Sequence, residues 1–107
     1  MKLHYFNLYG RAEAIRMMLA AQRADWESVE YTQEEWPAIK ATMVGGTLPN
    51  LEFADGTKLG QSSAITRYVA KTGGFYPEDA YLALQADSLT ETLIEYLGKF
   101  VGGNFGT

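Results

Sequence analysis

The chain has 107 residues, of which 47% are hydrophobic, 21% charged and 13% aromatic. This composition is typical of one globular domain and excludes a disordered tail. Thirteen acidic residues outnumber nine basic ones, giving a formal net charge of -4 at pH 7, which disfavours binding to nucleic acid or to an anionic membrane surface. Because cysteine is absent, disulfides, thiolate metal sites and a redox dithiol are excluded, and the single His4 cannot form a metal site alone.

The two ends of the sequence bear on compartment and completeness. The first residues lack the apolar core and cleavage site of a signal peptide, and no stretch is long and apolar enough to cross a bilayer. We therefore expect a cytoplasmic protein with no membrane insertion. Residues 102–107 are rich in glycine, and we interpret them as a frayed tail or a truncation point.

The first half of the chain predicts two strands, each followed by a helix. Residues 2–6 alternate polar and apolar side chains, which indicates a strand. A helix is expected from Arg11, because apolar residues recur at helical spacing, and a second strand is expected over residues 27–31. Thr32 and Glu35 form a capping-box pattern that leads into a short helix over residues 36–40, ending by Gly45. The apolar face of the first helix comprises Ala12, Ile15, Met18 and Leu19.

The next segment predicts a hairpin and a third helix. A strand is expected over residues 48–53, and Asp55-Gly56 is a strong turn signal that joins it to a strand at residues 57–59. Ser62 or Ser63 is expected to cap a helix that carries Ile65, Tyr68 and Val69 on one face and ends at Gly73-Gly74. This order of elements predicts an α/β sandwich of the thioredoxin type.

Pro77 marks the expected boundary between residues 1–77 and residues 78–107. From Leu82 onward the spacing predicts a long amphipathic helix. Its apolar stripe has no obvious partner helix in the sequence, so it either lies against the first domain or pairs with another molecule. The stripe comprises Ala86, Leu89, Leu93, Leu97 and Phe100.

Several short strings then occur together in one order along the chain. They are YFNLYGRAE at residues 5–13 with Ile15-Arg16, Trp36-Pro37 with Lys40, Leu48-Pro49 with Leu51-Glu52, Asp55-Gly56, and Gln61-Ser62 with Ala64-Ile65 and Arg67-Tyr68. Together they resemble the cytosolic glutathione transferases, particularly the sigma class. The resemblance implies a thioredoxin-like glutathione-binding domain at residues 1–77, followed by the first helix of a truncated all-α domain. It also implies glutathione as co-substrate and a small hydrophobic electrophile as the second substrate.

The resemblance implies that Tyr5 is the catalytic residue, donating its hydroxyl hydrogen bond to the sulfur of glutathione. Lowering the pKa of a free thiol from near 8.5 by about two units requires about 2.7 kcal/mol. One hydrogen bond to a charged acceptor supplies about 1.5–3 kcal/mol. A single well-placed tyrosine is therefore sufficient. The alternative is that Tyr5 simply packs a strand.

The resemblance also implies a set of glutathione-binding residues. Ser62 and the start of its helix would bind the γ-glutamyl carboxylate, although Ser62 could be a plain N-cap. Leu48 would pair its backbone with the cysteinyl part, provided that Pro49 is cis. Trp36 and Lys40 would meet the glycine end, or else be a packed tryptophan and a solvated lysine. The full implied set is Arg11, Trp36, Lys40, Leu48, Pro49, Gln61 and Ser62, whereas Glu13 and Arg16 are expected to be structural.

Three departures from the family pattern affect these expectations. Thr47 stands where sigma-class members commonly have lysine, which removes a cation near the glycine end. Gly45-Gly46 replaces a bulkier stretch, so a looser loop is expected. Ile94 interrupts the acidic residues Glu91 and Glu95, which makes a divalent-ion site doubtful.

Two functions from different classes therefore remain open. The first is a glutathione transferase that conjugates or isomerises a hydrophobic electrophile. The second is a non-catalytic structural or assembly subunit of a larger complex. The helix from Leu82 is expected to form a homodimer or to dock on a larger assembly. A glutaredoxin-like oxidoreductase is disfavoured because the chain has no cysteine nucleophile.

Overall fold

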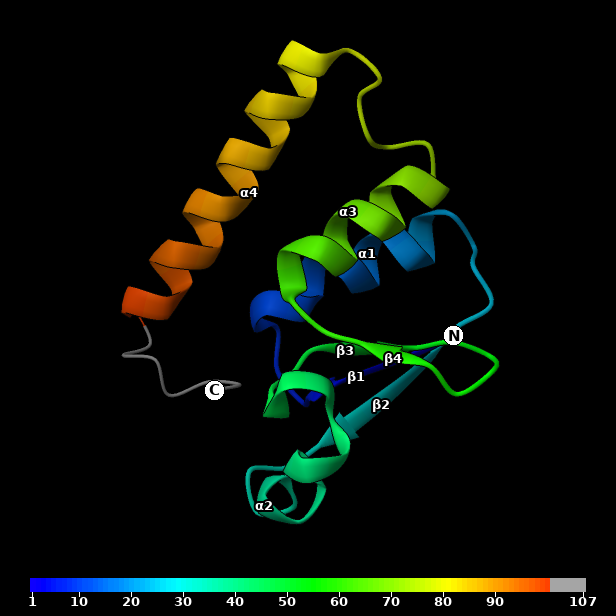
Figure 1. Ribbon diagram of the computed structural model, residues 1–107, viewed down its shortest axis with the longest axis vertical. Helices are drawn as coiled ribbons and strands as arrows, with labels where there is room; N and C mark the ends of the chain where they lie inside the picture. The colour runs from blue at the N-terminus through cyan, green and yellow to red at the C-terminus, as the bar shows by residue number, and fades with distance from the viewer. Residues whose placement is uncertain (101–107) are drawn as a thin grey trace.

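The computed structural model describes residues 1–100, apart from the side chain of Phe100. It contains a four-stranded sheet in the order β2-β1-β3-β4, shown in Figure 1. β1 (Lys2–Phe6) runs parallel to β2 (Glu27–Tyr31) and antiparallel to β3 (Asn50–Glu52). β4 (Lys58–Leu59) completes the hairpin at the far edge. β1 is therefore a central strand, with neighbours on both sides.

Helices cover both faces of the sheet. α1 (Glu13–Ala21), preceded by the 3-10 turn η1 (Gly10–Ala12), lies beside α3 (Ser62–Thr72) on one face, and the α2 region lies on the other (Figure 1). That region consists of α2 (Trp36–Ile39) and the 3-10 turns η2 (Lys40–Thr42) and η3 (Val44–Gly46). This mixed sheet between helices is the expected thioredoxin-like α/β arrangement.

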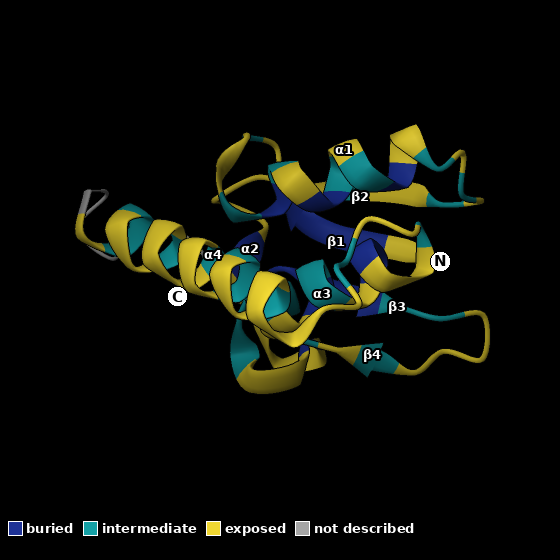
Figure 2. Ribbon diagram, turned by 90° about the horizontal axis from the view of Figure 1, so that it is seen from above, coloured by how far each residue is buried: buried dark blue, intermediate teal, exposed yellow. Residues whose placement is uncertain are grey.

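The core surrounds β1, which Figure 2 shows as buried along almost its whole length. Leu3 and Tyr5 are almost completely buried, and Ile15 and Leu19 of α1 belong to the same cluster. On the α2 side, the rings of Phe6 and Trp36 meet edge to face, with centroids 5.5 Å apart. Burial of this much apolar surface is the main stabilising contribution to the domain.

Most of the expected elements are present, with shifted ends. The capping box is confirmed: Glu35 N–H donates to Thr32 Oγ1 at 3.1 Å, and Thr32 N–H donates to Glu35 Oε1 at 2.9 Å. The hairpin turn is confirmed by the bond from Thr57 N–H to Asp55 Oδ1 at 2.9 Å. The regular helix α1 begins at Glu13 rather than Arg11, because η1 occupies residues 10–12. The third strand is shorter than expected, since only residues 50–52 pair with a neighbour.

The prediction that Ser62 or Ser63 caps the third helix is wrong. Gln61 occupies the N-cap position with φ 73° and makes no side-chain capping bond. Both serines therefore lie inside the first turn of α3. The face of this helix also differs from the expectation, because Ile65 and Val69 are buried but Tyr68 is 43% exposed. Tyr68 instead packs its ring edge to face with Phe53, at 5.6 Å between centroids.

The long helix α4 (Ala80–Phe100) begins before Leu82, and Asp79 Oδ2 accepts a hydrogen bond from Leu82 N–H at 3.0 Å. It contacts α3 and η1. Of the two arrangements expected from the sequence, it therefore adopts the one in which the helix lies against the first domain. The stripe predicted from the sequence coincides only in part with the buried face, however, since Ala86 and Leu97 belong to both. Leu89 and Leu93 are more than half exposed, whereas the partly buried positions are Ala83, Ala86, Asp87, Thr90, Ile94, Leu97 and Gly98.

A polar cluster joins α4 to the segment before it. Tyr76 donates its hydroxyl hydrogen to Asp87 Oδ2 at 2.8 Å, and Arg67 Nε lies 3.0 Å from Asp87 Oδ1. Arg67 also pairs with Glu91 at 3.5 Å. The hydrogen bond from Tyr76 and the charge of Arg67 hold the pKa of Asp87 below its ordinary value.

The expectation for residues 102–107 lies outside the described residues. None of the helices within residues 1–100 combines the length and the apolar character that a membrane span requires.

Candidate active site

A pocket of about 220 Å³ opens where α3, η1, the loop before β3 and α4 meet. Five of the eight site residues predicted from the sequence line it. These are Arg11, Leu48, Pro49, Gln61 and Ser62, and they are joined by Thr47 and Ile94. Residues more than forty positions apart in the sequence therefore contribute to one concave site.

Tyr5 lies beside this pocket without lining it. Its side chain is 1% exposed, and its hydroxyl oxygen accepts a hydrogen bond of 2.9 Å from the backbone N–H of Arg11. Because the oxygen accepts from Arg11, the hydroxyl hydrogen remains available for a second partner. Burial raises the pKa of Tyr5, while the Arg11 hydrogen bond and the charges of Arg11 and Arg16 lower it in part. Tyr5 is therefore protonated at neutral pH, and its hydroxyl has a hydrogen to donate.

Gly10 makes the close approach of chain and hydroxyl possible. It has φ +45°, and a Cβ atom at this position would overlap the Tyr5 hydroxyl and the Leu8 side chain. The turn between β1 and α1 can therefore lie directly over Tyr5 only if residue 10 has no side chain. In the sequence, Gly10 stood out only as part of the string at residues 5–13.

Arg16 supports Tyr5 from α1. Its guanidinium donates to Phe6 O at 3.0 Å and to Leu8 O at 2.7 Å, and its central carbon lies 5.4 Å from the centre of the Tyr5 ring. Glu13 pairs with Arg16 at 3.4 Å. Both residues hold the turn after β1 in place, which agrees with the structural role expected for them. The position of Arg16 over the Tyr5 ring could not be predicted from the sequence.

Gln61 and Ser62 lie at the amino end of α3, where backbone N–H groups lack partners within the helix. The positive end of the helix dipole and these donors favour an anion. Ser62 O accepts a bond from the Thr66 hydroxyl at 2.7 Å. The arrangement can therefore accept a carboxylate, although Ser62 does not have the N-cap position that was also considered for it.

The opposite wall of the pocket is the loop that leads into β3. The Leu48–Pro49 peptide bond is cis, as the expectation for this turn required. Gly45 and Gly46 both have positive φ, 73° and 65°, but the loop is not simply loose. The buried side chain of Asn50 hydrogen-bonds to its backbone at three residues. Sequence reasoning missed Asn50, whose only signal was an amide at a position expected to be buried in a strand.

The structure does not bring Trp36 and Lys40 to the pocket. Trp36 is 9% exposed and packs on Phe6 in the core, while Lys40 is an exposed residue in η2. The stem of Lys40 lies near Gly46, where a Cβ would be 3.5 Å from Lys40 Cε. Their role at the glycine end of glutathione therefore remains a prediction.

The acidic residues of α4 are directed to other partners. Glu91 pairs with Arg67, and Glu95 pairs with Lys99 at 3.6 Å. Ile94, which lies between them in the sequence, reaches the pocket instead. The pocket wall from α4 is therefore apolar at this point.

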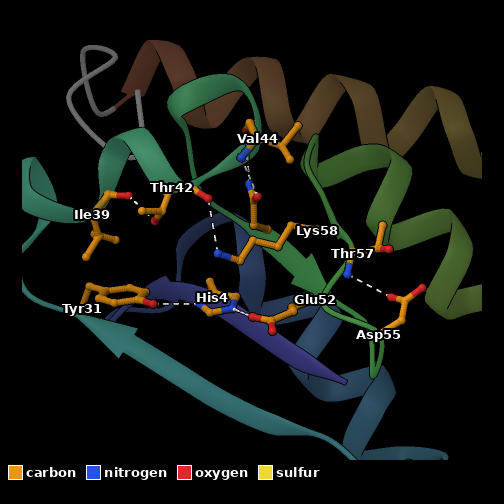
Figure 3. Close-up of polar contacts among 10 residues, drawn as sticks. His4, Tyr31, Ile39, Thr42, Val44, Glu52, Asp55, Thr57 and Lys58 are labelled. Atoms are coloured by element: carbon orange, nitrogen blue, oxygen red, sulfur yellow. Dashed lines mark hydrogen bonds and ion pairs between the residues drawn. The ribbon is translucent and has the colours of Figure 1, made fainter.

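A second polar cluster lies on the opposite face of β1 from Tyr5 (Figure 3). His4 Nδ1 is 2.8 Å from the Tyr31 hydroxyl, and His4 Nε2 is 2.8 Å from Glu52 Oε1. The three residues come from β1, β2 and β3. The hydrogen bond with His4 lowers the pKa of Glu52. The two hydrogen bonds of His4 link three neighbouring strands through their side chains.

The fold and the pocket define a thioredoxin-like domain with a binding site at the start of α3. Residues 1–71 match the family described as "Glutathione S-transferase, N-terminal domain". The chain therefore belongs to the glutathione S-transferase family.

Individual relatives agree with this assignment. The chain is 37% identical over 95 residues to a glutathione S-transferase of Anopheles gambiae, covering 89% of this chain and 46% of the relative. It is 38% identical to mouse hematopoietic prostaglandin D synthase, covering 92% and 49%. The structure of a prostaglandin synthase D from Nilaparvata lugens superposes with a TM-score of 0.86 at 35% identity, covering 94% and 51%. The chain thus spans about half the length of these relatives.

Proposed function

We propose that this chain binds glutathione in the pocket between α3 and the loop before β3. The observation that supports the proposal is that Arg11, Leu48 and Ser62 line one cavity, with the Tyr5 hydroxyl bonded to the backbone of Arg11. The amino end of α3 would receive the γ-glutamyl carboxylate. The backbone of Leu48 would pair with the cysteinyl part as an added strand does. Trp36 and Lys40 would approach the glycine end.

Tyr5 would stabilise the thiolate of bound glutathione. Its oxygen already accepts from Arg11, so its hydrogen is available to a separate acceptor, and the raised pKa keeps that hydrogen on the hydroxyl. A hydrogen bond to the sulfur favours the thiolate over the thiol by about 1.5–3 kcal/mol, which lowers the thiol pKa by about one to two units. The thiol proton leaves to solvent, and the thiolate is the nucleophile.

The reaction that follows is the attack of this thiolate on a small hydrophobic electrophile. In conjugation, a sulfur–carbon bond forms and a leaving group departs with its electron pair. In isomerisation, the sulfur attacks and is later released, so glutathione is regenerated. Relatives with both kinds of name are similar to this chain, so both reactions are retained. The electrophile would be held mainly by the helical domain that begins at residue 78, beyond the glutathione-binding domain of residues 1–77.

The variant Tyr5→Phe tests this mechanism. Removing the hydroxyl should raise the pKa of bound glutathione by about one to two units while glutathione still binds. The thiolate absorbance of bound glutathione, measured against pH, reports that pKa directly. An equal pKa in the variant and the unmodified protein would show that Tyr5 does not stabilise the thiolate.

The second candidate is a non-catalytic subunit, and it is favoured by the exposed face of α4. Leu82, Leu89 and Leu93 lie on one side of this helix, and each is more than half exposed. Such a face suits a homodimer or docking on a larger assembly. Retention on glutathione resin together with turnover of an aryl halide would favour the enzyme. Absence of both would favour the subunit. In either case we propose a cytoplasmic protein.

A further inference from the structure

Asn50 is a polar side chain in the core of this domain. It is 0% exposed, at the start of β3, where an unpaired amide would be costly. Its amide is instead satisfied by the backbone of the preceding loop. Asn50 Oδ1 accepts from Val44 N–H at 2.9 Å, and Nδ2 donates to Thr47 O at 2.9 Å and to Pro49 O at 3.1 Å. Figure 3 marks the contact at Val44.

The loop at residues 44–49 needs this support. Gly45 and Gly46 add no side chains that could pack, and glycine loses more conformational freedom on folding than any other residue. The loop's own backbone supplies the turn bond from Gly46 N–H to Met43 O at 3.0 Å. Asn50 fixes Val44 before the two glycines and Thr47 after them. One side chain therefore restrains the loop on both sides of its two glycines.

The packing behind Asn50 keeps this arrangement tight. Val44 O lies 3.3 Å from Asn50 Nδ2, within reach of the same amide. On β4's side, a Cβ at Gly60 would lie 3.3 Å from both Asn50 Nδ2 and Val44 O. The absence of a side chain at residue 60 therefore leaves room for the amide beside the loop.

The restrained segment is also the wall of the candidate glutathione site. Thr47, Leu48 and Pro49 line the pocket, whereas Asn50 does not. We propose that Asn50 is a positioning residue that sets the affinity for glutathione, because it fixes the backbone with which the cysteinyl part would pair. This inference rests on the proposed function. In this inference, Asn50 orders a loop in which Gly45 and Gly46 have no side chains that could do so.

A positioning role and a purely structural role of Asn50 predict different effects of its substitution on glutathione binding. If Asn50 acts on the backbone of Leu48, its loss weakens glutathione binding while the Tyr5 hydroxyl and the thiolate pKa stay unchanged, because Tyr5 is held separately by Arg11. If Asn50 only stabilises the fold, binding by the folded fraction stays unchanged. The dissociation constant and the thiolate pKa therefore separate the two roles.

The test uses Asn50→Leu, which keeps the branched shape in a somewhat larger side chain without an amide, and the isosteric Asn50→Asp, whose carboxylate cannot donate to Val44 O, Thr47 O or Pro49 O. Val69→Ala is the control, because it removes buried atoms from α3 away from the pocket. Calorimetry in the full chain at a temperature where each variant is folded gives the dissociation constant for glutathione. If Asn50→Leu does not fold, Asn50→Asp carries the comparison.

We expect the dissociation constant to rise about tenfold or more in both Asn50 variants, the effect of losing one to two hydrogen bonds, and less than about twofold in Val69→Ala. Amide exchange at Val44 should accelerate in the Asn50 variants only. Equal dissociation constants in the unmodified protein and the Asn50 variants would overturn this inference alone. A lack of glutathione binding by the unmodified protein would overturn the proposed function as well.

Discussion

The backbone N–H of Arg11 donates a 2.9 Å hydrogen bond to the hydroxyl oxygen of Tyr5. This contact couples the end of β1 to the start of the helical segment, and it belongs to the main chain. The side chain at residue 11 can therefore change without removing the bond, whereas a shift of the turn would break it. The geometry of the turn, more than the identity of residue 11, decides where the tyrosine hydroxyl lies.

Gly10→Ala should displace the Tyr5 hydroxyl. A Cβ at residue 10 overlaps this hydroxyl, and φ is +45°, so we expect a loss of about 1–3 kcal/mol in unfolding free energy and a thiolate pKa shifted toward that of free glutathione. Urea unfolding and thiolate absorbance measure the two effects. Gly56→Ala is the matched control, since φ is +89° but nothing lies within 4 Å of its Cβ. If bound glutathione has the same thiolate pKa in Gly10→Ala as in the unmodified protein, the expectation is contradicted.

Arg16→Gln should weaken the support of Tyr5. It removes the donors to Phe6 O and Leu8 O and the positive charge 5.4 Å from the Tyr5 ring. We expect a loss of about 2–3 kcal/mol in unfolding free energy, together with a further rise in the pKa of Tyr5. Ultraviolet titration of tyrosine in Arg16→Gln, with Tyr5→Phe to assign the signal, measures that pKa. Lys99→Gln, at a side chain that is 77% exposed, should change neither value.

Glu52→Gln should remove a pH-dependent part of the stability. Hydrogen bonding to His4 lowers the pKa of Glu52, and the charges of His4, Lys2 and Lys58 act in the same direction. The folded-state pKa is therefore below the unfolded value of about 4.3, so the stabilising contribution is present above that value and is lost as pH falls through the folded one. Urea midpoints of both proteins between neutral and acid pH should converge at low pH. A constant difference would argue against this linkage.

Tyr76→Phe should loosen α4 without disturbing the sheet. The hydroxyl of Tyr76 donates to Asp87 at 2.8 Å and joins the segment after α3 to α4. Hydrogen exchange should accelerate for backbone amides near Asp87 and stay unchanged in α1. The same measurement on Tyr81→Phe, at an exposed ring on α4, should show no change. Equal exchange in all three proteins would mean that the hydroxyl does not restrain α4.

The sequence predicted those features that depend on local spacing. The buried face of α1, the Thr32–Glu35 capping box and the Asp55-Gly56 turn are all confirmed, because each arises from residues within one or two turns of chain. The capping of α3 was mistaken because Gln61 adopts a positive φ that its residue type does not favour. Such a conformation is set by the neighbouring strand and loop, which local patterns do not describe.

Other features could not be predicted from local sequence patterns, because they depend on contacts formed only in the folded chain. The leucines of α4 have helical spacing, but Leu89 and Leu93 are exposed, whereas Ile94 is partly buried. The periodicity therefore predicted the helix but not which of its faces contacts the domain. Motif resemblance brought Arg11, Leu48 and Ser62 into one predicted site, and the pocket unites them. The His4 cluster was missed because its partners are brought together only by the pairing of β1, β2 and β3. Asn50 was missed although its partners lie within six residues of it, because those bonds depend on the fold of the loop before β3.

The dependence of the loop before β3 on Asn50 has a consequence for protein engineering. Its shape is encoded largely outside its own residues, in one amide that follows it. Transplanting residues 44–49 into another scaffold would transfer the two glycines without their restraint, whereas a graft that also includes residue 50, with space like that at Gly60, would transfer the conformation. The smallest portable unit is therefore defined by its hydrogen bonds and not by the ends of the loop.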